Sequence, residues 1–160
     1  MQNLPILTEK IGLCFKAFKQ EGNNLVLVDQ PHPYLFDHNA IEVDSLLTLS
    51  IQLKQLESHP NCLVIRGQLI AGRPSESIRR TLKASADEEP NFEHCSRQWC
   101  LIDIDDLPLP EHLSDYKNNK TEIVGFAVSH LPEQFHNVKC WYQFSSNMGI
   151  KEGKVRLHLW

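Results

Sequence analysis

Cys100-Leu101-Ile102-Asp103-Ile104-Asp105-Asp106 is an apolar run that ends in alternating carboxylates. Because side chains alternate between the two faces of a strand, Asp103 and Asp105 share one face and the two isoleucines share the other. Buried carboxylates are costly unless they are paired or bound to a metal ion. Oxygen ligands suit Mg²⁺ or Mn²⁺. These ions serve phosphoryl transfer in many enzymes, so the pattern points to that reaction. The pattern leaves one alternative open, a strand that ends at Asp103, with the later carboxylates solvated before Pro108.

Length and composition are those of one globular domain. The 160 residues are 41% hydrophobic and 22% charged, which is ordinary for a chain with a real core. A membrane span is not expected, because no run of about 18 apolar residues occurs. Residues 1–5 lack the basic and apolar regions of a signal peptide. We therefore expect a cytoplasmic protein.

The five cysteines are scattered and include no CxxC pair. This distribution favours reduced thiols that serve as small core residues. His94, Cys95 and Cys100 could supply three zinc ligands, which is the less favoured interpretation.

Charge is unevenly distributed along the chain. The net charge of −4 argues against a protein that coats nucleic acid with its whole surface. Residues 66–83 nevertheless hold five basic residues against one acidic residue, and residues 139–160 hold four against one. Acidic residues gather in 87–89 and 103–106. Two basic segments around an acidic strand would suit a polyanion held over a metal ion, although such runs are more commonly solvated faces.

The hydrophobic pattern predicts a mixed α/β (α+β) fold. Helices are expected over 6–19 and from Leu46 to near His59-Pro60, the second with Asp44 or Ser45 as its N-cap. Strands are expected over 25–28, 62–65, 99–105, 140–144 and 154–160. Residues 71–98 should be irregular, with a short helix near 78–83, and residues 123–128 fit either a strand or a buried helix.

The last strand carries a second chemical motif. In Val155-Arg156-Leu157-His158-Leu159 the apolar residues face the core, so the polar residues share the other face with Lys154 and Trp160. Arginine offers a bidentate fork for phosphate, and histidine offers a neutral or charged donor. The preceding turn contains Ser145-Ser146 and Gly149, which could approach a phosphate closely. The alternative for this segment alone is an ordinary half-exposed strand.

Together the two motifs resemble those of the archaeo-eukaryotic primase superfamily. The resemblance is greatest to primase-polymerase domains of plasmid, phage and integrated-element replication proteins. In that family a hydrophobic-Asp-hydrophobic-Asp motif carries the metal ligands, here Asp103 and Asp105. A later Ser-x-His motif contacts the nucleotide phosphates, and here it reads Arg156-Leu157-His158. Further similarities run from about residue 45 onward and include Leu63–Gly67, Arg79-Arg80 and Trp99.

The resemblance implies a primase-polymerase-like nucleotidyltransferase of a mobile-element DNA replication protein. Residues 1–98 would form an αβ unit and residues 99–160 an incomplete RRM-like palm, with the site between them. Mg²⁺ or Mn²⁺ at Asp103 and Asp105 would serve two-metal phosphoryl transfer from a (d)NTP. The nucleotide phosphates would be bound by His158, Arg156, Ser146 and Lys154. A single-stranded DNA template would be bound by Arg66, Arg79 and Arg80. A helicase domain or subunit could be a further partner.

The sequence departs from the family pattern in two respects. Arg156 stands where the family has serine, and the family's third carboxylate is absent because no Asp or Glu follows His158. We therefore expect weak metal and nucleotide binding and little or no polymerisation, from either a fragment or a reduced relative. One rival is a haloacid-dehalogenase-type phosphatase, whose nucleophile loop has threonine where Leu107 stands here. The other is a non-catalytic module derived from a primase that binds nucleotide or single-stranded nucleic acid.

Overall fold

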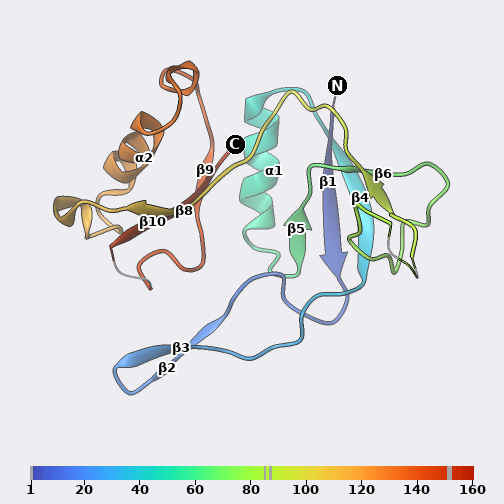
Figure 1. Cartoon of the computed structure of the whole chain (residues 1–160), viewed down its shortest axis with the longest axis horizontal. Coiled ribbons are helices and arrows are strands. Elements are labelled where there is room, and N and C mark those ends of the chain that lie inside the picture. Colours follow the sequence, from blue (N-terminus) through green and yellow to red (C-terminus); the bar gives the residue numbers. More distant parts are fainter. Residues whose placement is uncertain (1, 85, 87, 151–152) are drawn as a thin grey trace. The chain divides into compact units, whose positions relative to one another are not determined.

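The structure is a computed structural model that describes residues 2–84, 86, 88–150 and 153–160. It divides into two compact units, the first made of residues 1–19 with 26–98 and the second of residues 20–25 with 99–160. Each unit has its own three-stranded sheet and α-helix (Figure 1), which confirms the α+β class. Asp87, Lys151 and Glu152, which belong to the charged segments noted above, lie outside the described residues.

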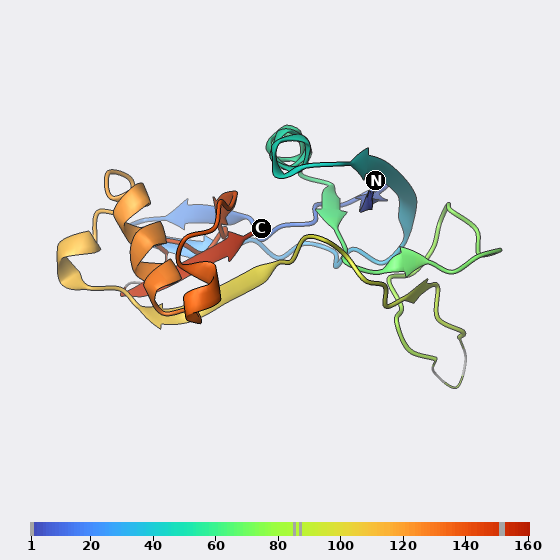
Figure 2. The same ribbon diagram turned by 90° about the horizontal axis from the view of Figure 1, so that it is seen from above.

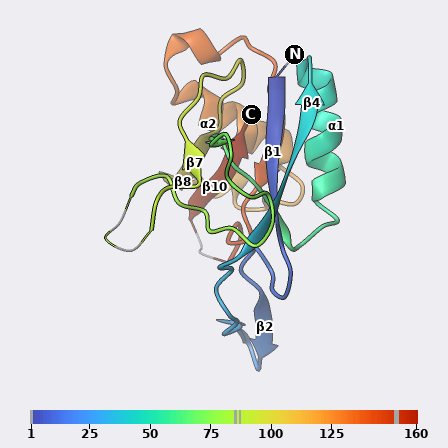
Figure 3. The same cartoon turned by 90° about the vertical axis from the view of Figure 1, so that its right-hand side faces the viewer.

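The first unit is organised around strand β1 (Gln2–Glu9). β1 lies between β4 (Phe36–Val43) and β5 (Cys62–Val64) and is antiparallel to both (Figure 1). Figure 3 shows β1 beside β4. Helix α1 (Leu46–Leu56) connects β4 to β5 and buries Leu49 and Leu53. The Ser45 hydroxyl accepts a hydrogen bond from the Thr48 amide, and the Thr48 side chain accepts from the Ser45 amide. This capping box confirms the predicted helix and its N-cap.

The helix predicted over residues 6–19 is wrong. Its first residues belong to β1, where Leu4, Ile6 and Leu7 are buried in the centre of the sheet. Ile11 is 94% exposed and Phe15 is 44% exposed, so the expected apolar stripe does not face a core. A short apolar run fits a buried strand as well as a helix, and pairing with two neighbouring strands decides the outcome.

Two further pairs of strands lie outside the three-stranded sheets. β2 (Phe18–Glu21) pairs with β3 (Asn24–Leu27), and β6 (Gln68–Leu69) pairs with β7 (Phe92–Glu93). The described residues 78–83 form no helix, contrary to prediction. Ile78 instead exchanges backbone hydrogen bonds of 2.8 and 2.9 Å with Phe36, because its buried side chain joins the core of the first unit.

His38 on β4 gives the first unit a pH-dependent stability. Its ring centroid lies 5.7 Å from that of Phe92, and burial lowers the pKa of the imidazole. The unfolded chain titrates near the ordinary value of about 6.5, so it binds more protons than the folded chain as the pH falls below that value. We expect the urea midpoint, followed by circular dichroism, to decrease between about pH 7 and about pH 5. The decrease should be smaller in His38→Gln, and an equal decrease in both proteins would contradict this assignment.

The second unit follows the order strand, helix, strand, strand. It contains β8 (Ile102–Pro108), α2 (Lys120–Ser129), β9 (Tyr142–Phe144) and β10 (Lys154–Leu159), with short 3-10 helices over Glu111–Leu113 and Glu133–Phe135. β10 lies between β8 and β9 and is antiparallel to both. Residues 123–128, which fit a strand or a helix in the sequence, belong to α2. α2 covers one face of this sheet (Figure 2), where Ile123 and Ala127 are buried in one core with Val155, Leu157 and Leu159.

Candidate functional site

The side chains that are candidates for binding or catalysis lie on the sheet face opposite α2. Ile102 and Ile104 pack into the core with α2, whereas Asp103 and Asp105 are exposed, in agreement with the alternation predicted from the sequence. The strand does not end at Asp103 but continues to Pro108. We term this surface the polar face. It is defined by Asp103, Asp105, Asp106, Gln143, Arg156 and His158, all of which belong to the second unit.

Asp103 and His158 form one cross-strand row of the polar face. They are opposite each other in the register of β8 and β10, and His158 Nε2 lies 3.3 Å from Asp103 Oδ1. On the other side, Gln143 of β9 is opposite His158. The His158 side chain is 33% exposed and that of Asp103 is 55% exposed, so a solute can reach both. The row therefore offers an imidazole nitrogen and a carboxylate to one ligand.

A bulge in β8 brings two carboxylates to Arg156. The register pairs Leu157 with Ile104 and Val155 with Leu107, so Asp105 and Asp106 together oppose one residue of β10. The guanidinium nitrogens of Arg156 lie 3.3 Å from Asp105 Oδ1 and 2.6 Å from Asp106 Oδ1. Asp106 is the residue that sequence reasoning missed, since strict alternation would turn its side chain away from Asp105.

Burial is unequal within this ion-pair cluster. The Arg156 side chain is only 8% exposed, whereas those of Asp105 and Asp106 are 63% and 71% exposed. Lys154 donates from Nζ to the Asp106 backbone carbonyl across 3.3 Å. The guanidinium is therefore the buried charge, and the carboxylates are its solvated partners.

Four buried side-chain polar atoms in the described part of the chain lack a hydrogen-bond partner, and all four belong to the second unit. They are Trp99 Nε1, Ser145 Oγ, Arg156 Nε and Trp160 Nε1. The Ser145 amide donates to the Arg156 carbonyl across 3.0 Å, so Ser145 extends the β9–β10 pairing beside Arg156. Unpaired buried groups cost about 1–3 kcal/mol each. The nitrogens of tryptophan and arginine only donate, and all four atoms are shielded from solvent.

Asp103 and Asp105 suit a divalent ion only when a phosphate group supplies further oxygen ligands. No group of three or more His, Cys, Asp or Glu that could hold a metal ion occurs within residues 2–84, 86, 88–150 and 153–160. Asp103 and Asp105 pair with His158 and Arg156 but remain more than half exposed. Mg²⁺ is commonly bound through one or two carboxylates together with substrate phosphates. Asp103 and Asp105 fit that mode, whereas they do not form an all-protein metal site.

The turn before β10 was expected to approach a phosphate through its serines and Gly149, and the structure supports this for Ser146 but not for Gly149. Ser146 is exposed at the start of the turn, where it remains a candidate contact for a phosphate. Gly149 has a φ of +77°, and a Cβ at this position would lie 2.1 Å from Cε1 of Tyr116. The close approach that this glycine permits is therefore to the tyrosine ring.

Arg66, Arg79 and Arg80, the predicted template contacts, lie in the first unit. Arg79 pairs with Glu88 at 2.5 Å, and its guanidinium lies 4.4 Å from the centroid of the Tyr34 ring. Arg66 and Arg80 are exposed. Arg79 is thus engaged in local contacts, and Arg66 and Arg80 remain the accessible candidates.

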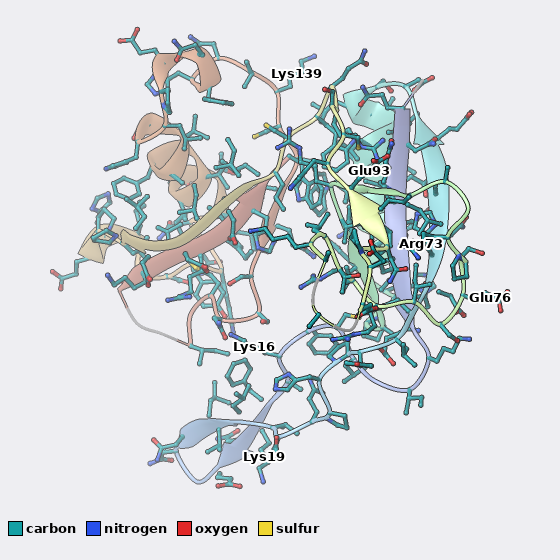
Figure 4. The ribbon with its side chains drawn as sticks, turned by 45° about the vertical axis from the view of Figure 1, so that its right-hand side comes forward. Lys16, Lys19, Arg73, Glu76, Glu93 and Lys139 are labelled. Atoms are coloured by element: carbon teal, nitrogen blue, oxygen red, sulfur yellow. The ribbon has the colours of Figure 1, made fainter. Side chains whose placement is uncertain are left out.

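Carboxylates from outside the basic segment 66–83 pair with part of its positive charge in the structure. Arg73 lies on the loop after β6 (Figure 4), with its Nη2 3.9 Å from Glu89 Oε2. Glu88 pairs with Arg79. Glu88 and Glu89 therefore neutralise part of the charge of the basic segment.

No family model, curated protein or solved structure matches the chain. No helix in the described ranges is long and apolar enough to cross a membrane.

Proposed function

We propose that the second unit is a primase-polymerase-type palm that binds a (d)NTP with Mg²⁺ or Mn²⁺ on its polar face, as part of a mobile-element DNA replication protein. The observation that supports it most is that the acidic and basic motifs meet on adjacent strands, with Asp103 opposite His158. The order strand, helix, strand, strand, with the last strand between the other two, is consistent with an RRM-like palm.

Four residues of the polar face, Asp103, Asp105, Arg156 and His158, have defined roles in this proposal. Arg156 and His158 donate hydrogen bonds to the triphosphate and stabilise its charge. Asp103 and Asp105 would hold the divalent ion, which neutralises the phosphates when bound. Lys154 and Ser146 are further candidate phosphate contacts. Arg156 and His158 already contact the carboxylates of Asp105 and Asp103. A triphosphate would therefore compete with these carboxylates for the same two donor side chains. Nucleotide and metal should therefore bind cooperatively.

Calorimetry with Mn²⁺ alone, a dNTP alone and both together tests this proposal. We expect little binding of the ion alone and clear binding of the Mn²⁺–dNTP pair. Binding of the pair should weaken by more than about tenfold in Asp103→Ala/Asp105→Ala, which removes the only protein ligands proposed for the ion. Glu111→Ala/Glu133→Ala is the matched control, since it also removes two carboxylates of the second unit but none from the polar face. Unchanged binding in the aspartate variant would contradict the proposal.

Transfer activity requires a separate test. Because Asp103 and Asp105, both on β8, are the only protein ligands proposed here for the ion, we expect slow or absent primer extension on a single-stranded DNA template. Template-dependent incorporation that Asp103→Ala abolishes would show instead that these residues suffice for catalysis. A helicase domain or subunit remains a proposed partner.

The second candidate function is a non-catalytic module that binds nucleotide or single-stranded nucleic acid. It is favoured by the pairing of Asp105 and Asp106 with Arg156, which satisfies these carboxylates without a metal ion. Salt-dependent binding of single-stranded DNA that survives Asp103→Ala/Asp105→Ala would support it over the first proposal.

A further inference from the structure

The chain's three tryptophans gather at one end of the polar face. Trp141 and Trp160 exchange backbone hydrogen bonds of 3.1 and 2.9 Å, which extends the pairing of β9 and β10. Trp160 follows buried Leu159 and therefore shares the face of His158. The ring centroids of Trp99 and Trp160 are 5.6 Å apart, and the rings are tilted by 41°. We term these three residues the tryptophan platform.

The platform is separate from the core of the second unit. Tyr142 and Phe144 pack into that core beside α2, but none of the tryptophans is among the described residues that form it or pack against it. Buried indole N–H groups usually have an acceptor. Those of Trp99 and Trp160 have none. All three tryptophans are only partly buried, so parts of their flat rings remain accessible to a planar ligand.

We propose that the tryptophan platform binds an unpaired nucleobase by stacking. Every nucleobase has a flat π-face that can stack on an accessible indole ring. This inference rests on the proposed function, because it assigns the base-binding part of the site whose phosphate-binding part is His158 and Arg156.

The spacing along β10 agrees with one nucleotide bound across the face. Residues two apart on one face of a strand are separated by about 7 Å, so Trp160 and Arg156 are about 13 Å apart along β10. That distance is comparable with the length of an extended nucleoside triphosphate. The base would lie at the platform, and the phosphates would extend past His158 toward Arg156.

Intrinsic fluorescence provides a direct measurement, because all three tryptophans of the chain belong to the platform. The probes are dTTP with Mg²⁺, single-stranded oligothymidylate, an abasic strand of the same length and inorganic tripolyphosphate. We expect a fluorescence change with dTTP, with oligothymidylate or with both, and none with the two probes that lack bases. A change with dTTP alone identifies the base of the free nucleotide, and a change with oligothymidylate alone identifies the base of a strand.

The substitution series separates stacking from folding. Trp160→Ala should weaken binding of the base-bearing probe by about 5- to 100-fold, whereas Trp160→Phe should retain most of the affinity. Trp141→Phe is a second variant if Trp160→Ala does not fold, and it should lose only a small part of the affinity. Phe144→Leu, on the core face of β9, is the matched control.

The platform and the proposed function can fail independently. Equal affinity for oligothymidylate and the abasic strand, with no fluorescence change from dTTP or either strand, would overturn the platform. Calorimetric binding of tripolyphosphate that His158→Ala abolishes would leave the proposed function intact in that case. A base-dependent fluorescence change without any tripolyphosphate binding would support the platform and contradict the proposed phosphate site.

Discussion

Gly149→Ala is expected to destabilise the second unit by about 3 kcal/mol, the sum of backbone strain and a steric clash. Gly149 has a φ of +77°, a conformation that costs an L-residue about 1 kcal/mol or more. A Cβ would also lie 2.1 Å from Cε1 and 2.6 Å from Cζ of Tyr116. Tyr116 packs against the core of the same unit, so its ring cannot move away freely. Urea denaturation followed by tryptophan fluorescence measures the loss.

Gly22→Ala is the matched control for this substitution. Gly22 has a φ of +60° and belongs to the second unit, and a Cβ added to it would meet no atom within 4 Å, so it reports the strain without the clash. We expect it to cost about 1 kcal/mol. In a Tyr116→Ala background the cost of Gly149→Ala should fall to a similar value, since the clash is then absent. Equal costs at the two glycines in the otherwise unchanged chain would contradict the clash.

Asp105→Asn/Asp106→Asn is expected to lower the free energy of unfolding by about 3 kcal/mol, more than Arg156→Met does. The Arg156 side chain is 8% exposed, whereas the two carboxylates are 63% and 71% exposed. Asparagine keeps an oxygen that accepts from the guanidinium, but removing both carboxylate charges leaves the buried cation without an opposite charge, which is the costly way to break such a cluster. The measurement is the urea midpoint and slope of each variant at one pH and salt concentration.

Arg156→Met provides the reverse deletion. Methionine retains much of the apolar volume, and the carboxylates left behind are solvated, so we expect a cost of about 1 kcal/mol or less. Asp105→Asn alone should cost less than the double change, because Asp106 Oδ1 still lies 2.6 Å from the guanidinium. If Arg156→Met were the more destabilising change, the guanidinium would not be the buried charge of the cluster.

Local patterns predicted several features of this chain correctly. The spacing of Leu49 and Leu53 after a serine cap predicted α1, and period-two alternation predicted which residues of β8 and β10 face the core. These features follow from neighbouring residues, because helix capping and strand alternation are properties of a short segment. The same locality explains the wrong helix over residues 6–19, where a short apolar run allowed two structures and strand pairing selected one.

The sequence by itself therefore determined the α+β class, the helix α1 and the chemical character of β8 and β10, the two adjacent strands that carry the site. Only the tertiary structure decided the register that sets Asp103 opposite His158 and the bulge that brings Asp106 to Arg156. It also decided that Trp99 and Trp160, which are distant in the sequence, meet at one end of the polar face. The physical reason is that alternation assigns a side chain to a face, whereas its neighbours on that face come from segments paired across the chain.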